Sequence, residues 1–222
     1  FRTNRYVGPD RIGDANQVSV GVTTRLLDSS RGRQYLSATL GQAFYFQDPR
    51  VALPDEPVRD RSTSDVVAEV ELNAYKNWNA RFAYQWNPDE TQGERSETFV
   101  QYNPTPGRVI NAGYRFRRDL LEQVDVSGAW PINNQWRGFA RFVYSLQEEN
   151  TLDQFLGLEY SSCCWAVRVI GRRFISSRSG AAETSIGLQL ELKGLSNVGV
   201  DNESFLRDAI RGYSALAPEP RP

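Results

Sequence analysis

The chemistry that this sequence can offer lies in two adjacent cysteines and in its charged side chains. Cys163 and Cys164, in the stretch SSCC, are the only cysteines among 222 residues, and the chain has no His. Without His or a second Cys cluster, the sequence predicts neither a zinc site nor the usual general base for a Ser or Cys nucleophile. We therefore expect no catalytic site, no metal site and no cofactor, and the protein is not expected to be an enzyme.

The two cysteines pose a question of geometry. Adjacent side chains of a strand or tight turn point in opposite directions, so a disulfide between Cys163 and Cys164 would need a strained ring. This chain has no other thiol with which either could pair.

The charged residues are numerous and balanced. The 26 Lys and Arg side chains meet 27 Asp and Glu side chains, which gives a formal net charge of -1. This balance does not favour general binding to nucleic acid. No run approaches the roughly 18 consecutive apolar residues of a membrane-spanning helix.

Extended strands are the elements that would position these side chains. In 77–86 one face carries Trp78, Ala80, Phe82, Tyr84 and Trp86, and the other carries Asn77, Asn79, Arg81, Ala83 and Gln85. A helix would mix these two sets, whereas a strand separates them. The same alternation recurs along the chain, in 16–26, 34–46, 63–75, 108–116, 122–130 and 183–192. It predicts about eleven strands of roughly ten residues each over positions 14–192.

Strand length, aromatic placement and loop length favour an antiparallel transmembrane β-barrel segment. Soluble strands average about five or six residues, whereas membrane barrel strands need about nine to eleven. The aromatic residues gather near predicted turns, as a girdle at the two membrane interfaces would require. Short turns fall on one side, at 28–32, 76–77, 103–107, 131–134 and 161–164, and the longer loops fall on the other. A soluble β-sandwich binding module stays open as an alternative.

The predicted strands form part of a larger structure. An odd strand number and a start inside an apparent loop indicate that 1–192 is the C-terminal section of a barrel with further strands upstream. Residues 193–222 lose the alternation and are predicted to be a periplasmic C-terminal tail, with one short amphipathic turn near 203–210.

If the apolar face meets lipid, the polar face lines a lumen. Its charged positions are of mixed sign, which suits an amphiphile that carries sugar and phosphate, because Arg binds phosphate through two hydrogen bonds while carboxylates accept from hydroxyls. A merely hydrated interior, or a surface that contacts a plug, is the alternative for any one of them. The lumen-lining candidates are Glu69, Glu71, Arg81, Arg115, Asp125, Arg137, Arg141, Glu159 and Arg168.

Three stretches resemble a known family. The segments 4–26, 157–169 and 190–199 are similar to the C-terminal part of the lipopolysaccharide-assembly outer-membrane protein family (LptD-type), the barrel subunit of the lipopolysaccharide transport translocon. The resemblance runs over essentially all of 1–200. It implies a barrel in the outer membrane of a Gram-negative bacterium, which receives lipopolysaccharide from a periplasmic bridge protein and releases it into the outer leaflet through a lateral gate.

The resemblance also implies residue roles and partners. The pair Cys163 and Cys164 would form disulfides with cysteines of the protein's own N-terminal periplasmic domain, and a lipoprotein subunit would plug the lumen. Residues 183–192 match the final strand, which makes Ile186, Leu188 and Leu190 the candidate gate positions. A substrate-selective outer-membrane porin or receptor barrel is the alternative within the membrane class.

Overall fold

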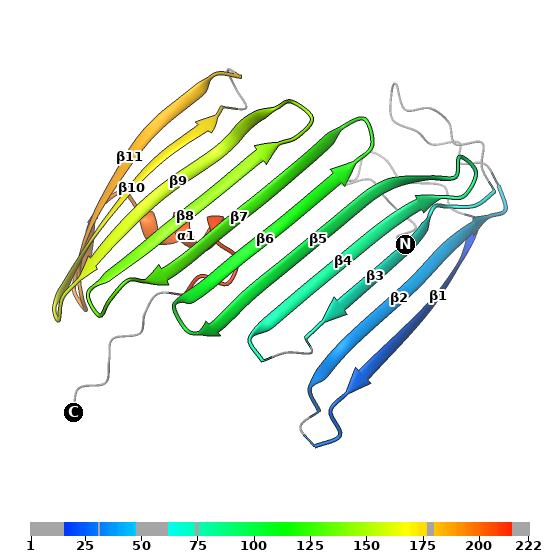
Figure 1. Ribbon diagram of the computed structural model, residues 1–222, viewed down its shortest axis with the longest axis horizontal. Helices are drawn as coiled ribbons and strands as arrows, with labels where there is room; N and C mark the ends of the chain where they lie inside the picture. Colours follow the sequence, from blue (N-terminus) through cyan, green and yellow to red (C-terminus); the bar gives the residue numbers. More distant parts are fainter. Residues whose placement is uncertain (1–15, 31, 48–61, 74–75, 177–179, 215–222) are drawn as a thin grey trace. The chain divides into compact units, whose positions relative to one another are not determined.

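The computed structural model describes residues 16–30, 32–47, 62–73, 76–176 and 180–214 (Figure 1). In these residues almost every regular element is a β-strand, and the strands follow one another in the sheet in chain order. The strands are β1 (Gln17–Leu27), β2 (Gln34–Tyr45), β3 (Val66–Leu72), β4 (Trp78–Asn87), β5 (Gln92–Thr105), β6 (Arg108–Arg117), β7 (Leu121–Pro131), β8 (Trp136–Ser145), β9 (Asn150–Ser161), β10 (Trp165–Ile175), β11 (Ala182–Leu192) and β12 (Ser196–Gly199). One α-helix, α1 (Asn202–Ala209), follows them.

The predicted all-β antiparallel fold is confirmed, and so is the number of long strands. The twelfth strand was missed because its four residues are too few for alternation to be read. Lys76 and Asn77, one of the expected short turns, form a turn just before β4, and Asn77 takes a left-handed conformation (φ 70°). Across the described residues, no helix is long and apolar enough to cross a bilayer.

The chain divides into two compact units, of which the first comprises residues 1–72 and 82–96. In this unit β1 pairs with β2 and β2 pairs with β3, all antiparallel. The register places the apolar side chains of the three strands on one face, where Val20, Val22 and Leu40 are exposed. Glu69 and Glu71 alternate with the apolar residues of β3 and therefore point to the other face.

The second unit comprises residues 73–81 and 97–222, and Figure 1 shows its strands β6 to β11 side by side. One face of these strands, here called the outer face, carries large apolar side chains that are exposed: Ile110, Val126, Leu156, Leu158, Val169, Ile186, Leu188 and Leu190. No described element covers them. Residues of opposite parity form the inner face, against which α1 packs.

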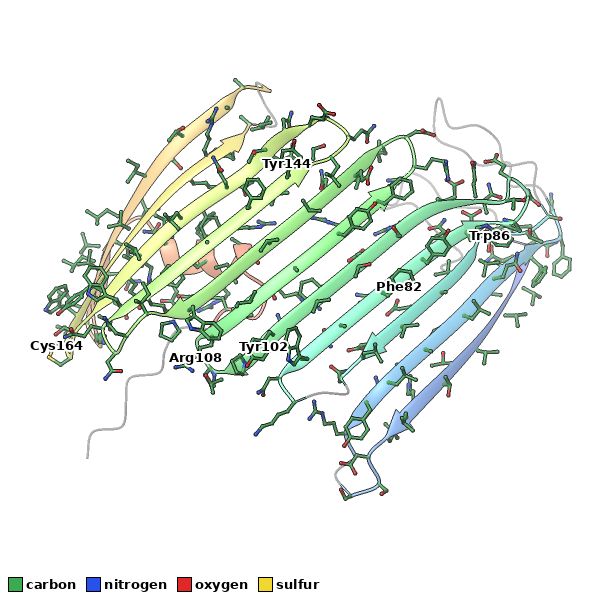
Figure 2. The ribbon with its side chains drawn as sticks, in the orientation of Figure 1. Phe82, Trp86, Tyr102, Arg108, Tyr144 and Cys164 are labelled. Carbon is green, nitrogen blue, oxygen red and sulfur yellow. The ribbon has the colours of Figure 1, made fainter. Side chains whose placement is uncertain are left out.

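Aromatic side chains line the outer face where the strands meet the short turns. Trp78, Tyr102 and Trp130 form a row with ring centroids 4.7 and 6.4 Å apart. Trp136, Tyr160 and Trp165 form a second row, with centroids 5.1 and 5.3 Å apart. Figure 2 shows Tyr102 at this end of the strands and Tyr144 at the other. An aliphatic band between aromatic ends is the pattern of a barrel exterior at the two membrane interfaces.

The core of this unit lies on the inner face. Val109, Ala129, Phe139, Phe155 and Ile170 come from five neighbouring strands, and Leu206, Ile210 and Tyr213 come from α1 and the residues after it. Leu206 and Ile210 are fully buried. The C-terminal segment therefore packs on the sheet through an apolar patch set within an otherwise polar face.

Candidate functional site on the inner face

The structure places six of the predicted lumen-lining residues together on the inner face of the second unit. They are Arg115, Asp125, Arg137, Arg141, Glu159 and Arg168, on strands β6 to β10. Arg81, on β4, belongs to the same unit, and Glu69 and Glu71 belong to the first. The six form two clusters, one open and one covered by the C-terminal segment.

The open cluster is a ladder of alternating charge across four strands. Arg141 donates two hydrogen bonds to the carboxylate of Asp125, at 3.3 and 2.7 Å, and lies 3.8 Å from Asp153. Arg172 donates to both oxygens of Asp153, at 2.9 and 3.0 Å. Two hydrogen bonds from one guanidinium to one carboxylate fix the orientation of the arginine side chain, so its charge has a defined position on the inner face.

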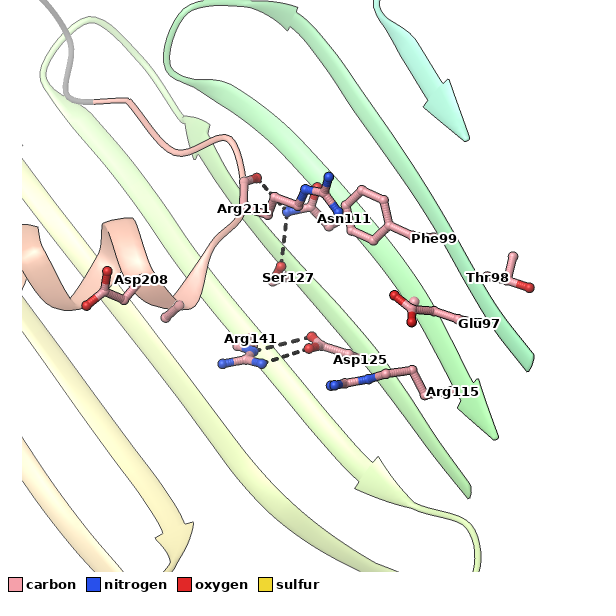
Figure 3. Close-up of a pocket in the computed structure, with 12 residues that line it drawn as sticks. Glu97, Thr98, Phe99, Asn111, Arg115, Asp125, Ser127, Arg141, Asp208 and Arg211 are labelled. Atoms are coloured by element: carbon pink, nitrogen blue, oxygen red, sulfur yellow. Dashed lines mark hydrogen bonds and ion pairs between the residues drawn. The ribbon is translucent and has the colours of Figure 1, made fainter. Parts of the chain in front are cut away.

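A pocket of about 250 Å³ lies beside this ladder, between the sheet and the end of α1 (Figure 3). Its charged lining alternates in sign: Arg115, Arg141 and Arg211 with Glu97, Asp125 and Asp208. The Arg211 guanidinium stacks 4.4 Å from the centre of the Phe99 ring. The amide of Asn111 donates to Ser127 Oγ at 3.2 Å and to the Arg211 carbonyl at 3.0 Å, which ties the polar floor of the pocket to the tail. Such a lining can bind a ligand that carries both anionic and hydroxyl groups.

The covered cluster lies around Arg168. Arg168 forms an ion pair with Glu159 on the neighbouring strand, and it donates to Gln189 Oε1 at 2.8 Å on the other side. Arg168 and Glu159 are 4% and 5% exposed. The Asn202 side chain, at the start of α1, donates to the Arg168 carbonyl at 3.3 Å.

Arg137 is enclosed in the same way. Its guanidinium lies against the rings of Phe139 and Tyr213, 5.3 and 4.8 Å from their centres, and these two rings contact each other edge-to-face. It donates to the carbonyls of Gly107 and Ser214, at 3.0 and 2.8 Å. The C-terminal segment therefore rests on Arg137. It also reaches the ladder at Arg172, whose guanidinium lies 5.1 Å from the centre of the Phe205 ring, whereas Asp125 and Arg141 stay partly exposed beside the pocket.

Sequence reasoning missed several members of both clusters. Asp153, Arg172, Gln189 and Glu191 have the inward parity of their strands, and this parity would have found them. The packing of the C-terminal tail on this face left a weaker signal in the sequence. That signal is a set of apolar residues at inward positions, which interrupt the otherwise polar face. Those positions are Val109, Ala129, Phe139, Phe155 and Ile170.

The cysteine turn lies at the end of the unit that carries the short turns (Figure 2). Both thiols are exposed and neither forms a disulfide, and Cys163 Sγ and Cys164 Sγ are 2.7 Å apart, within hydrogen-bond distance. Lys193 ties the turn to the end of β11, since its amine donates to Ser161 Oγ at 2.8 Å and its N–H donates to the Cys164 carbonyl at 2.9 Å. Hydrogen bonds from Cys164 and then Ser162, with the nearby Lys193 charge, lower the pKa of Cys163.

The family described as LPS transport system D (LptD) matches residues 1–136. This chain belongs to the LptD family. The LPS-assembly protein LptD of Nitrosococcus oceani is 39% identical over 96% of this chain, and that of Aromatoleum aromaticum is 39% identical over 97%. The Nitrosomonas eutropha protein of the same name is 40% identical over 96% of the chain. The chain spans 27–29% of the length of these three relatives, so it corresponds to a section of an LptD protein. The resemblance drawn from three sequence motifs is confirmed.

Proposed function

We propose that the protein containing this section moves lipopolysaccharide from the periplasm into the outer leaflet of the outer membrane of a Gram-negative bacterium. The observation that carries the proposal is the division of the second unit into an exposed apolar outer face and a charged inner face. Membership of the LptD family supports it, because the relatives are named for lipopolysaccharide assembly.

The outer face supports the membrane part of the proposal. Ile186 and Leu156 are 78% and 70% exposed. Transfer of such apolar side chains from water to hydrocarbon lowers their free energy. On β8, Trp136 and Tyr144 both face outward and are about 26 Å apart along the strand, since each residue advances it by about 3.3 Å. A strand tilted by about 40° brings this to about 20 Å along the membrane normal, close to the height of a barrel's apolar band.

The inner face supports the conduit part. The ladder of Asp125, Arg141, Asp153 and Arg172 presents fixed charges of both signs beside the pocket. Phosphate groups of lipopolysaccharide would meet guanidinium groups there, while sugar hydroxyls would meet carboxylates. The conduit is passive, so the energy for transport comes from periplasmic partners, and the lipid portion leaves through a lateral gate that includes β11.

The partners follow from the same proposal. Cys163 and Cys164 form disulfides with cysteines of the N-terminal periplasmic domain, and their exposure at the short-turn end supports this pairing. A periplasmic bridge protein delivers the substrate, and a lipoprotein subunit occupies the lumen beside the polar face. A porin or receptor barrel would need no such cysteine pair, so a reductant-sensitive shift of the full-length protein in electrophoresis favours the translocon. Extraction into the aqueous phase without detergent would instead favour a soluble module.

Charge reversal in the pocket tests the conduit. In the full-length protein, Arg115→Glu is expected to raise outer-membrane permeability to large antibiotics and to reduce lipopolysaccharide at the cell surface. Arg115→Lys keeps the charge, and Arg207→Glu makes the same reversal on an exposed side chain of α1 outside the pocket. Both controls should behave as wild type. Unchanged permeability for Arg115→Glu, at wild-type levels of folded protein in the membrane, would contradict the assignment of this pocket to the sugar path.

A further inference from the structure

The last long strand, β11, is paired differently along its two halves. Residues of an antiparallel strand direct their N–H and C=O groups alternately to the two neighbouring strands. The N–H of Lys193, the residue after β11, donates to the Cys164 carbonyl just before β10 at 2.9 Å, whereas the Leu188 carbonyl accepts from Val200, 3.0 Å away on the opposite side. The even-numbered residues of β11 therefore direct their backbone groups away from β10.

β12 occupies only one half of this second edge. It pairs Leu190 with Val198 and Leu192 with Ser196, at the end of β11 next to the cysteine turn. Towards the other end, Ala182, Thr184 and Ile186 present backbone groups on the same edge, and no described strand pairs with them there. Half of the edge is covered by the chain itself and half is open.

Two features hold β12 in place. Gly199 has a φ of +107°, and a Cβ at this position would lie 2.2 Å from the Leu188 carbonyl oxygen, so only glycine lets the chain approach β11 so closely. Immediately afterwards, Asp201 caps α1 by accepting from Ser204 N–H at 3.0 Å, and α1 packs on the inner face. The chain leaves the edge at Val200 because its next apolar residues are buried on the inner face.

We propose that β12 is a built-in cap on the edge of the final strand, which confines closure of the barrel to Ala182–Ile186. The occupant of the open half is an upstream antiparallel strand of the same polypeptide, here called the closing strand. Exposed backbone groups are not tolerated in hydrocarbon, and the relatives are more than three times as long as this chain. A seam limited to one half of a strand has few hydrogen bonds, and the open half lies away from the cysteine turn. With that turn in the periplasm, as the proposed function has it, the short seam lies in the outer leaflet, where lipopolysaccharide is to be released.

Photo-crosslinking in the full-length protein, in intact outer membranes, tests the cap. A benzophenone amino acid replaces Leu190 in one variant and Ile186 in another, and cross-linked peptides are identified by mass spectrometry. Side chains directly opposite on paired strands are about 5 Å apart. We expect Leu190 to capture the peptide with Ser196–Gly199, and Ile186 to capture the closing strand. Capture of the closing strand from Leu190 as well would overturn the cap.

Gly199→Ala provides the perturbation. The added Cβ should reduce capture of β12 from Leu190 by about tenfold or more, because the clash is with backbone, and capture of the closing strand from Leu190 should appear. Gly21→Ala is the matched control, since its Cβ would meet its nearest atom at an ordinary 3.5 Å. Unchanged capture of β12 in Gly199→Ala would contradict the role of the close approach.

The cap proposal rests on the proposed function only for the side of the membrane on which β12 lies and for its part in lipopolysaccharide release. The cap and the transport proposal can therefore be contradicted independently. If Leu190 captures β12 while depletion of the protein leaves lipopolysaccharide at the cell surface, the cap stands and the transport proposal is wrong. If depletion removes lipopolysaccharide from the surface while Leu190 captures the closing strand, transport stands and the cap is wrong.

Discussion

The docking of α1 on the inner face depends on a few buried side chains, and Leu206→Ala tests this dependence. An isolated helix of eight residues is not stable in water, so α1 must be held by its contacts. Leu206 is fully buried against the inner-face core, while Phe205 beside it contacts Phe155 with ring centroids 5.1 Å apart. Truncation of such a leucine costs about 2–3 kcal/mol where the neighbours partly collapse into the space, and more where they cannot.

The expected result is a change in the docking equilibrium. A loss of about 2–3 kcal/mol corresponds to a ratio of docked to undocked tail lower by about 30- to 150-fold. Amide hydrogen exchange of the full-length protein in lipid nanodiscs measures this ratio, as the protection of the backbone N–H groups of residues 205–210. Protection should fall by that factor while protection of β7 and β8 stays unchanged.

Arg207→Ala is the matched control. This neighbour in the helix is exposed and forms only a surface ion pair with Glu203, at 2.9 Å, so its removal should change protection by no more than about twofold. Equal effects of the two substitutions, or none from Leu206→Ala, would refute the reasoning that burial on the inner face holds the tail.

Three further predictions concern the start of α1, the Arg168 ion pair and the cysteine turn. Gly187→Ala should loosen the start of α1, because the new Cβ would lie 2.5 Å from Asn202 Oδ1, whereas Gly171→Ala, with no atom within 4 Å, should leave hydrogen exchange of the tail unchanged. Glu159→Gln should lower the stability of the full-length barrel by about 3 kcal/mol, because it removes the negative charge that pairs with the buried Arg168 guanidinium. Glu203→Gln, at the exposed ion pair, should cost less than about 1 kcal/mol. The temperature at which the folded band is lost in electrophoresis compares the two variants. In the reduced protein, the pH midpoint for alkylation of the Cys163 thiol should lie below the ordinary thiol value, because hydrogen bonds from Cys164 and Ser162 and the Lys193 charge stabilise the thiolate. Lys193→Gln should raise that midpoint. An unchanged midpoint would contradict the role of Lys193.

Strand parity accounts for most of what the sequence determined. Alternation is a local property, since each residue's face depends only on its count along the strand. For this reason the two sets in 77–86, and the outward direction of Ile186, Leu188 and Leu190, could be predicted before any contact was known. The same count placed Arg115 and Asp125 on one face, where the structure has them.

Parity could not say which inward residues meet one another, because that depends on register between strands. Only the register brings Arg172 to Asp153 and Arg168 to Gln189. Nor could parity foresee that the C-terminal segment covers Arg137 and Arg168 while leaving Arg141 at an open pocket. The tail carries no alternation, and its position depends on burial against residues far away in the chain. The sequence by itself thus determined the two faces of the sheet, through local stereochemistry, and the tertiary structure alone decided which part of the polar face remains open, through long-range packing of the last residues.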